Sequence, residues 1–231
     1  NSNAKLGKGD WAILEADESD GSFLKLPINY SIVTNIDQEH LDYYKNFKNL
    51  ENSFIRFIEK TPPTGKAIVC VDDRNVKKIL SRIKNKNILT YGVSEYADYR
   101  ISNIRYKIGY SIFDLSYKSL EKKNKKIKNI HLKLLGKHNV QNAAAAISIC
   151  LNLGVDKNVI KKSLKKFSGV QRRMTKIFSK NQNEFYDDYA HHPTEIRSIL
   201  EGVKNVHKNK KIVSVFEPVS YTHLTLPTTT I

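Results

Sequence analysis

Cysteine, tryptophan and methionine are scarce in this sequence of 231 residues, which holds two cysteines, one tryptophan and one methionine. Cys70 and Cys150 lie in apolar stretches without a metal ligand or a Cys-x-x-Cys partner nearby, which predicts packed thiols and excludes a disulfide framework. The single methionine, Met174, lies deep inside a patterned region. We therefore expect that it is not the initiator and that the chain is an internal fragment of a longer protein.

Long apolar runs and a glycine-rich phosphate loop are also missing. No run approaches the length of a membrane-spanning helix, and no signal-peptide pattern stands at the observed start. With no disulfide framework, these absences favour a cytoplasmic protein without a membrane partner. The GKG at residues 7–9 has neither the spacing nor the Ser or Thr of a phosphate loop. Nothing in the sequence predicts an oligomeric state.

Positive charge is abundant, with a formal net charge of +16. Clustered Lys and Arg can indicate a nucleic-acid partner, because they neutralise phosphates. The lysines fall mainly in runs typical of solvated faces, at residues 122–128, 161–166 and 208–211. A general enrichment in Lys, Asn and Ile explains the charge as well as a polyanion does, and we expect no nucleic-acid partner.

Short apolar runs rich in β-branched residues alternate with helical periodicity, which predicts an α/β fold with a mainly parallel sheet. The predicted strands are residues 11–16, 31–36, 66–71 and 87–91, with a helical region over 40–59. Alternating segments within 99–135 predict antiparallel strands added to that sheet. Residues 143–151 and 156–167 read as helices. The pattern then restarts as strand, helix and strand over 185–188, 193–203 and 211–216, with Pro193 at the first helical position.

Acidic residues follow the first two predicted strands. Glu15, Asp17, Glu18 and Asp20 lie in EADESDGSF, and Asp37, Glu39, His40 and Asp42 lie in TNIDQEHLD. Carboxyl ends of neighbouring parallel strands meet in one crevice, so these side chains are candidates for a Mg²⁺ and phosphate site. Alternatively, the Asp and Ser residues cap the following helices, and His40 is a structural hydrogen-bonding residue.

Three further segments carry polar side chains at helix starts or at a junction. In GKHNVQN, Asn139 and Asn142 either cap a helix or pair with an adenine edge. In FSGVQRRM, Arg172 and Arg173 either bind a transferring phosphate or form an interdomain salt bridge. In DDYAHHPTE, the paired histidines either bind metal or an anion, or serve local capping and packing.

The identity and order of these segments resemble the Mur ligase family over residues 4–218. EADESDGSFL, TNIDQEHLDYY, CVDD, GKHNVQNAAAA, FSGVQRRM, DDYAHHPTE and VFEP follow one another as they do in that family. The resemblance implies a P-loop-type ATPase central domain followed by the start of a Rossmann-like C-terminal domain. Residues 1–170 would belong to the central domain and 171–218 to the C-terminal one.

The resemblance also implies an ADP-forming ligase of peptidoglycan synthesis that uses ATP and Mg²⁺. Its substrates would be UDP-N-acetylmuramate and L-alanine, joined through an acyl phosphate. By the same resemblance, Glu15 would hold one Mg²⁺ and His40 the other, and Asn139 and Asn142 would face the adenine. The remaining implied roles are Arg173 at the γ-phosphate, Asp188 and Tyr189 at the nucleotide, and His191 near the amino acid.

The sequence departs from the family in two places. The phosphate loop is absent, and residues 219–231 replace the family's arginine-bearing turn with a threonine-rich stretch. We interpret this stretch as a non-native, adapter-derived tail and exclude it. We expect the fragment by itself to be inactive. Two alternatives stay open, namely a related ligase that adds another amino acid or a peptide, and a non-catalytic basic nucleic-acid-binding module.

Overall fold

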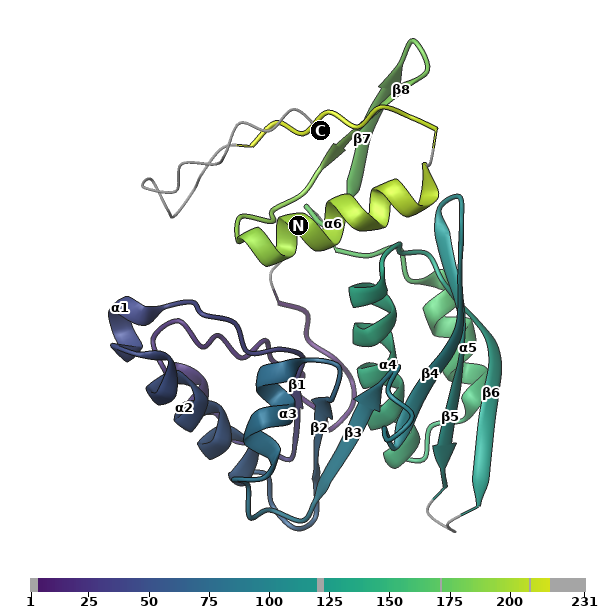
Figure 1. Cartoon of the computed structure of the whole chain (residues 1–231). Coiled ribbons are helices and arrows are strands. Elements are labelled where there is room, and N and C mark those ends of the chain that lie inside the picture. Colours follow the sequence, from purple (N-terminus) through teal and green to yellow (C-terminus); the bar gives the residue numbers. More distant parts are fainter. Residues whose placement is uncertain (1–3, 120–122, 171, 208, 217–231) are drawn as a thin grey trace. The chain divides into compact units, whose positions relative to one another are not determined.

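The computed structural model describes residues 4–119, 123–170, 172–207 and 209–216 (Figure 1). The chain divides into two compact units, Asn1–Leu89 and Thr90–Ile231. Among the described residues, no helix combines the length and apolar character needed to cross a membrane. The α/β architecture expected from the sequence is confirmed, with parallel strands, added antiparallel strands and covering helices.

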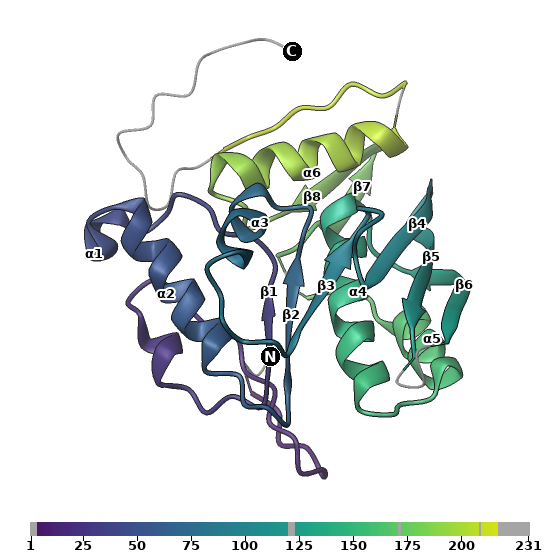
Figure 2. The same ribbon diagram turned by 60° about the horizontal axis from the view of Figure 1, so that its bottom comes forward.

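The first unit pairs two parallel strands beside short helices. Strands β1 (Tyr30–Val33) and β2 (Lys66–Cys70) run in the same direction, with Ile32 opposite Ile68 (Figure 2). The helices of this unit are η1 (Ser22–Lys25), α1 (Leu41–Tyr44), α2 (Phe47–Glu59) and α3 (Arg74–Leu80). Its core is apolar and includes Phe23, Val33, Leu50, Ile58 and Val69. Burial of this surface is the main term that stabilises the unit.

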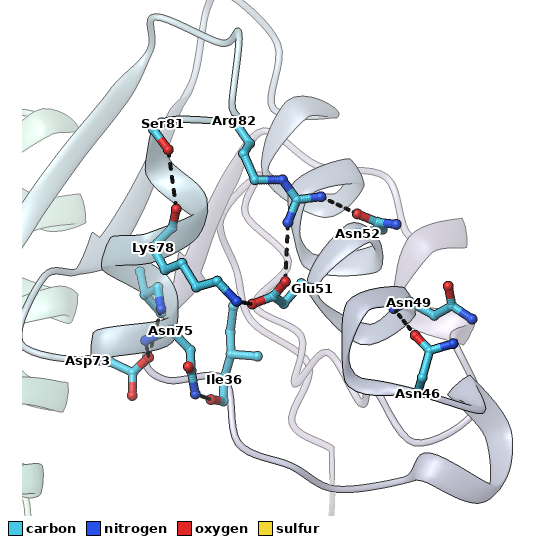
Figure 3. Close-up of polar contacts among 11 residues, drawn as sticks. Ile36, Asn46, Asn49, Glu51, Asn52, Asp73, Asn75, Lys78, Ser81 and Arg82 are labelled. Carbon is cyan, nitrogen blue, oxygen red and sulfur yellow. Dashed lines mark hydrogen bonds and ion pairs between the residues drawn. The ribbon is translucent and has the colours of Figure 1, made fainter.

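Helices α2 and α3 are capped at their starts and joined by a buried carboxylate (Figure 3). Asn46 caps α2, and Asp73 caps α3 by accepting from the amides of Asn75 and Val76. Glu51 of α2 is only 4% exposed and accepts from Lys78 Nζ at 2.8 Å and Arg82 Nη1 at 3.2 Å. The carboxylate therefore fixes α3 against α2.

The second unit contains β3 (Ile88–Gly92), which begins just before the unit boundary, and its described residues form five further strands, of which three continue the sheet from β3. Strand β3 pairs parallel with β4 (Tyr99–Lys107), whereas β5 (Tyr110–Lys118) and β6 (Asn124–Leu132) continue antiparallel. The register shifts at two bulges, where Asn103 and Asn129 adopt positive φ. Buried Asp114 accepts from the Asn103 side chain and the Asn129 amide, each at 2.8 Å, so its carboxylate holds both irregularities.

Two helices cover this sheet. Helix α4 (Lys137–Asn152) packs against β4 and β5, and α5 (Lys157–Lys166) packs against β6. Gly154 lies just beyond α4 with a φ of 76°, and the amide of Val155 bonds back to the Cys150 carbonyl. A glycine in this left-handed conformation is a common end of an α-helix.

The last described segment is a hairpin followed by a helix. Strands β7 (Thr175–Lys180) and β8 (Asn183–Asp187) pair antiparallel, and α6 (Pro193–Val206) begins with the predicted proline. Strand β7 is not predicted from the sequence. Five of its six residues are exposed, and Thr175–Lys180 lacks the alternation of apolar and polar residues that would indicate a strand.

Two predicted strands are wrong. Residues 11–16 and 211–216 form no strand, and Trp11, Ile13 and Val215 are 56%, 95% and 94% exposed. Both runs have β-branched or aromatic residues, but a strand also needs a hydrogen-bonding neighbour, and none of the described strands pairs with them.

The predicted domain boundary at 170/171 and the predicted tail remain predictions. The division of the chain into compact units falls between residues 89 and 90, and it does not test the predicted domain boundary. The tail, residues 219–231, lies outside the described residues.

Candidate functional site

The loop that follows Glu15 is folded against α1. Gly21 has a φ of 72°, and a Cβ at this position would lie 2.7 Å from the Tyr43 hydroxyl. Buried Tyr44 donates a hydrogen bond to the Glu18 carbonyl oxygen. Burial raises the pKa of Tyr44 to about 12, so this donor stays protonated throughout the ordinary pH range. The Tyr44 hydrogen bond therefore fixes the backbone of Glu18.

His40 and Glu39 follow β1 at the start of α1. Ile36 is buried below them, and its carbonyl accepts from the Asn75 side chain at 2.7 Å. His40 adopts φ 54° and ψ 33°, a left-handed conformation that turns the chain from the strand end into α1. His40 Nε2 lies 3.7 Å from a Glu39 carboxylate oxygen.

Glu18, Glu39 and His40 form one group of possible metal ligands in the described part of the chain. One ligand atom from each lies within 4.8 Å of the other two, and all three residues are partly buried. Burial raises the pKa of the Glu18 carboxyl, while the His40 charge opposes that shift. The group thus holds negative charge whose repulsion is relieved by a cation.

This donor set fits a hard divalent cation. Two carboxylates supply the oxygen ligands that Mg²⁺ prefers, and the imidazole adds a nitrogen. Glu15, which the resemblance places on a second ion, is exposed and is not in the group. Its role therefore stays a prediction. The Ser19 and Ser22 amides donate to Asp17 and Asp20 within the loop, but Gly21 and His40, the cap residues of η1 and α1, form no side-chain cap bond, so the capping alternative is not confirmed.

In the second unit, Asn139 and Asn142 lie three residues apart on α4, so they share one helical face. The Asn139 side chain donates to the Leu135 carbonyl at 2.7 Å, which orients its amide. The cap position is Gly136, without a side-chain cap bond, so neither asparagine caps α4. Asn142 is exposed, and its role with adenine stays a prediction.

Arg173 pairs with a carboxylate in α6. Its Nη1 lies 3.3 Å from Glu195 Oε1, and both side chains are partly exposed. Both partners fall within residues 171–218, so this pair does not join the two predicted domains. The guanidinium keeps free surface for a further anion, as its 49% exposure shows.

Asp188 and Tyr189 are held by the main chain and by Arg172. Asp188 accepts from the Met174 and Ala190 amides at 2.7 and 2.8 Å. The Tyr189 amide donates to the Arg172 carbonyl, and the Arg172 guanidinium lies 4.7 Å from the Tyr189 ring centroid. Asp188 thus serves to fix the turn, and the Tyr189 ring is 42% exposed.

The paired histidines have different positions. His192 caps α6 by accepting from the Thr194 amide at 3.4 Å, as the capping alternative predicts. His191 Nδ1 lies 3.1 Å from the Tyr189 carbonyl and 3.8 Å from Glu195 Oε2. His191 therefore faces the Arg173–Glu195 pair rather than serving as the cap.

The sequence analysis did not single out His138, which the structure places near Asp188, Arg173 and Glu195. Its ring lies over Gly136, where a Cβ would approach it to 2.7 Å. Burial lowers the pKa of His138, Asp188 and Glu195 raise it, and Arg173 lowers it. The motif GKHN contained this histidine, but the residues that surround it lie some 35 to 57 positions later.

Two family models match the chain. The Mur ligase middle domain matches residues 2–150, and the Mur ligase, glutamate ligase domain matches residues 172–223. The second match includes residues 219–223 of the predicted tail, which lie outside the described residues.

Two curated relatives carry the same name. A UDP-N-acetylmuramate–L-alanine ligase of Pelagibacter ubique is 52% identical over 216 residues, 94% of this chain and 47% of that protein. The same-named protein of Brucella anthropi is 43% identical over 222 residues, 96% of this chain and 47% of that protein. The chain therefore spans about half the length of these relatives.

Solved structures that resemble this chain are also Mur ligases. The UDP-N-acetylmuramate-alanine ligase of Thermotoga maritima superposes with a TM-score of 0.71 at 28% identity, covering 88% of this chain and 44% of that one. A MurF structure from Acinetobacter baumannii gives a TM-score of 0.64 at 26% identity, covering 77% and 37%. With the middle-domain model matching well over half of its residues, this chain belongs to the Mur ligase family.

Proposed function

We propose that this chain is part of an ATP-dependent ligase that joins L-alanine to UDP-N-acetylmuramate in peptidoglycan precursor synthesis. The observation that carries the proposal is the likeness to the Pelagibacter ubique protein of that name, at 52% identity over 94% of this chain. The polar groups described above support it, because they lie in the segments that carry the family resemblance.

In this proposal the first unit supplies ligands for Mg²⁺. His40 holds one ion, with Glu18 and Glu39 beside it as the carboxylates of the same group, and Glu15 holds another. Bound Mg²⁺ would offset the repulsion between a substrate carboxylate and the triphosphate. Tyr44 of α1 holds the backbone of Glu18 in place, which helps to organise the ligand group before an ion binds.

The second unit supplies contacts to the nucleotide. Asn139 and Asn142 offer amide donors and acceptors to the adenine from one face of α4. The Arg173 guanidinium faces the γ-phosphate, where its delocalised positive charge stabilises the charge that develops during transfer. Tyr189 offers an exposed ring to the nucleotide, and His191 lies toward the amino acid.

The reaction proceeds in two steps. The carboxylate oxygen of UDP-N-acetylmuramate attacks the γ-phosphorus, the bond to the β-phosphate oxygen breaks, and ADP leaves. The amine of L-alanine then attacks the acyl carbon and loses a proton, and inorganic phosphate leaves. The protein residues position these groups and balance charge, and they form no covalent bond.

Phosphate release from a grafted enzyme tests the proposal. Residues 4–216 replace the matched segment of the Pelagibacter ubique protein, and phosphate is measured with each substrate omitted in turn. We expect release only with ATP, UDP-N-acetylmuramate and L-alanine together, and loss of release in His40→Ala. The chain by itself, which lacks a phosphate-loop motif, is expected to release none. Release that ignores L-alanine would contradict the proposal.

A related ligase for another amino acid or a peptide is the second candidate. Its support is the structural likeness to MurF. A panel of amino acids and dipeptides in the same assay separates the two candidates. A third reading, binding of arbitrary nucleic acid, predicts salt-sensitive retention of DNA or RNA by the chain.

A further inference from the structure

Glu195 lies in the first turn of α6, three residues after the cap residue His192. In a capping box, a Glu at this position accepts from the amide of the cap residue itself. Here it accepts from the amide of His191, one residue earlier, at 3.3 Å. The carboxylate thus extends beyond the helix end that a capping role requires.

The two oxygens of Glu195 have different partners. Oε1 accepts from Arg173 Nη1 at 3.3 Å, and Oε2 accepts from the His191 amide and lies 3.8 Å from His191 Nδ1. A single carboxylate therefore contacts both the residue proposed at the γ-phosphate and the residue proposed near the amino acid. The charge of the same carboxylate raises the pKa of His138, against the larger lowering by burial.

Stability alone does not account for this arrangement. The Arg173 and Glu195 side chains are 49% and 35% exposed. Exposed ion pairs contribute little to stability, because water screens them. The larger effect of such a pair is on the direction in which the long Arg173 side chain points.

We propose that Glu195 is a positioning residue, which holds the Arg173 guanidinium and His191 in one hydrogen-bonded group aimed at the reacting phosphate and amine. This inference rests on the proposed function, in which Arg173 contacts the γ-phosphate. It assigns Glu195 no contact with substrate and no proton transfer. A carboxylate that orients a guanidinium acts through the guanidinium, so removing the charge of Glu195 while keeping its acceptor for the His191 amide should have no further effect once Arg173 is removed.

Two substitutions in the grafted enzyme test the proposal. Glu195→Gln keeps an acceptor for the His191 amide but loses the charge that holds Arg173. Glu195→Asp keeps the charge at the helix start but is one methylene too short to contact both partners. We expect each to lower kcat about tenfold or more, with an unchanged KM for UDP-N-acetylmuramate, because small misplacements of catalytic groups are costly.

The matched control is Glu184→Gln. Glu184 forms a similar ion pair with Lys176 at 2.6 Å in the β7–β8 hairpin, and its loss should leave kcat unchanged. A double-mutant cycle adds a readout that a structural role would not move. Arg173→Ala combined with Glu195→Gln should be no slower than Arg173→Ala alone.

The possible results distinguish failure of the positioning role from failure of the proposed function. An active wild-type graft in which Glu195→Gln and Glu195→Asp keep full kcat overturns the positioning role and leaves the proposed function standing. Fully multiplicative losses in the double mutant, or losses that match the unfolded fraction measured by circular dichroism, also overturn it. A wild-type graft without alanine-dependent phosphate release refutes the proposed function and this inference with it.

Discussion

Gly202 of α6 packs directly against Gly136, the cap residue just before α4. A Cβ on Gly202 would lie 3.4 Å from the Gly136 Cα, and Gly202 is buried. Gly136 needs its φ of 96°, a region that other residues avoid. The contact brings α6, with its Glu195, to the end of α4 that carries His138 and Asn139.

Substitutions at Gly202 should have opposite signs. Gly202→Ala places its Cβ at ordinary contact distance and gains helix propensity, so we expect the free energy of unfolding to rise by up to about 1 kcal/mol. Gly202→Val adds two methyl groups against Gly136 and should lower it by about 1–3 kcal/mol. Urea denaturation of the chain measures both, and equal effects of Ala and Val would contradict the packing described.

Glu51 should contribute more to the free energy of unfolding than a residue of an exposed ion pair does. Glu51→Ala removes a buried carboxylate that bonds Lys78 and Arg82, so we expect the free energy of unfolding to fall by about 1–3 kcal/mol. Lys77→Ala, at an exposed position of α3 next to Lys78, is the control and should change the free energy of unfolding by under about 0.5 kcal/mol. Equal losses in the two variants would show that the bonds of Glu51 to Lys78 and Arg82 do not stabilise this unit.

His138 should make stability depend on pH. Burial lowers its pKa in the folded state below the ordinary 6.5, so near that pH the unfolded chain binds more protons. The free energy of unfolding should therefore fall as the pH drops through 6.5 toward the folded pKa. Compared with the wild type, His138→Gln should lose less stability between pH 7.5 and 5.5.

The Arg173 charge contributes to this shift. It lowers the pKa of His138, so Arg173→Gln should raise that pKa in an NMR titration of the imidazole. A pKa of His138 at or above 6.5 in the wild-type chain would contradict the burial described.

Mn²⁺ should bind beside His40. The ion is a paramagnetic substitute for Mg²⁺, so adding it to the chain should broaden the His40 imidazole signals in NMR spectra. Glu18→Gln combined with Glu39→Gln should abolish the broadening, because both carboxylates of the group are lost. Glu59→Gln, in the same unit but outside the group, should leave it unchanged, and broadening that survives the double substitution would place the ion elsewhere.

The sequence predicted most elements because their signals are local. The apolar stripe of α2, the alanine run of α4 and the proline of α6 each act through neighbouring residues. The strands predicted at 11–16 and 211–216 failed because strand formation depends on a partner, which local pattern does not reveal.

The candidate site was predicted only in part, for the same reason. The sequence placed Glu18, Glu39 and His40 among eight candidates for one crevice, and the structure brings these three together although the strand predicted before Glu18 does not form. The contact of Glu195 with Arg173 and the approach of His138 depend on how α6 lies against α4. No spacing within a motif encodes that packing.

The most direct test of the proposed function is the identity of the product. The grafted enzyme is incubated with ATP, Mg²⁺, UDP-N-acetylmuramate and isotopically labelled L-alanine, and the sugar nucleotide is analysed by mass spectrometry. The account predicts one labelled alanine joined by an amide to UDP-N-acetylmuramate, formed in equal amount to ADP and phosphate. ADP formation without that conjugate, or conjugation of a different amino acid in preference to alanine, would contradict it.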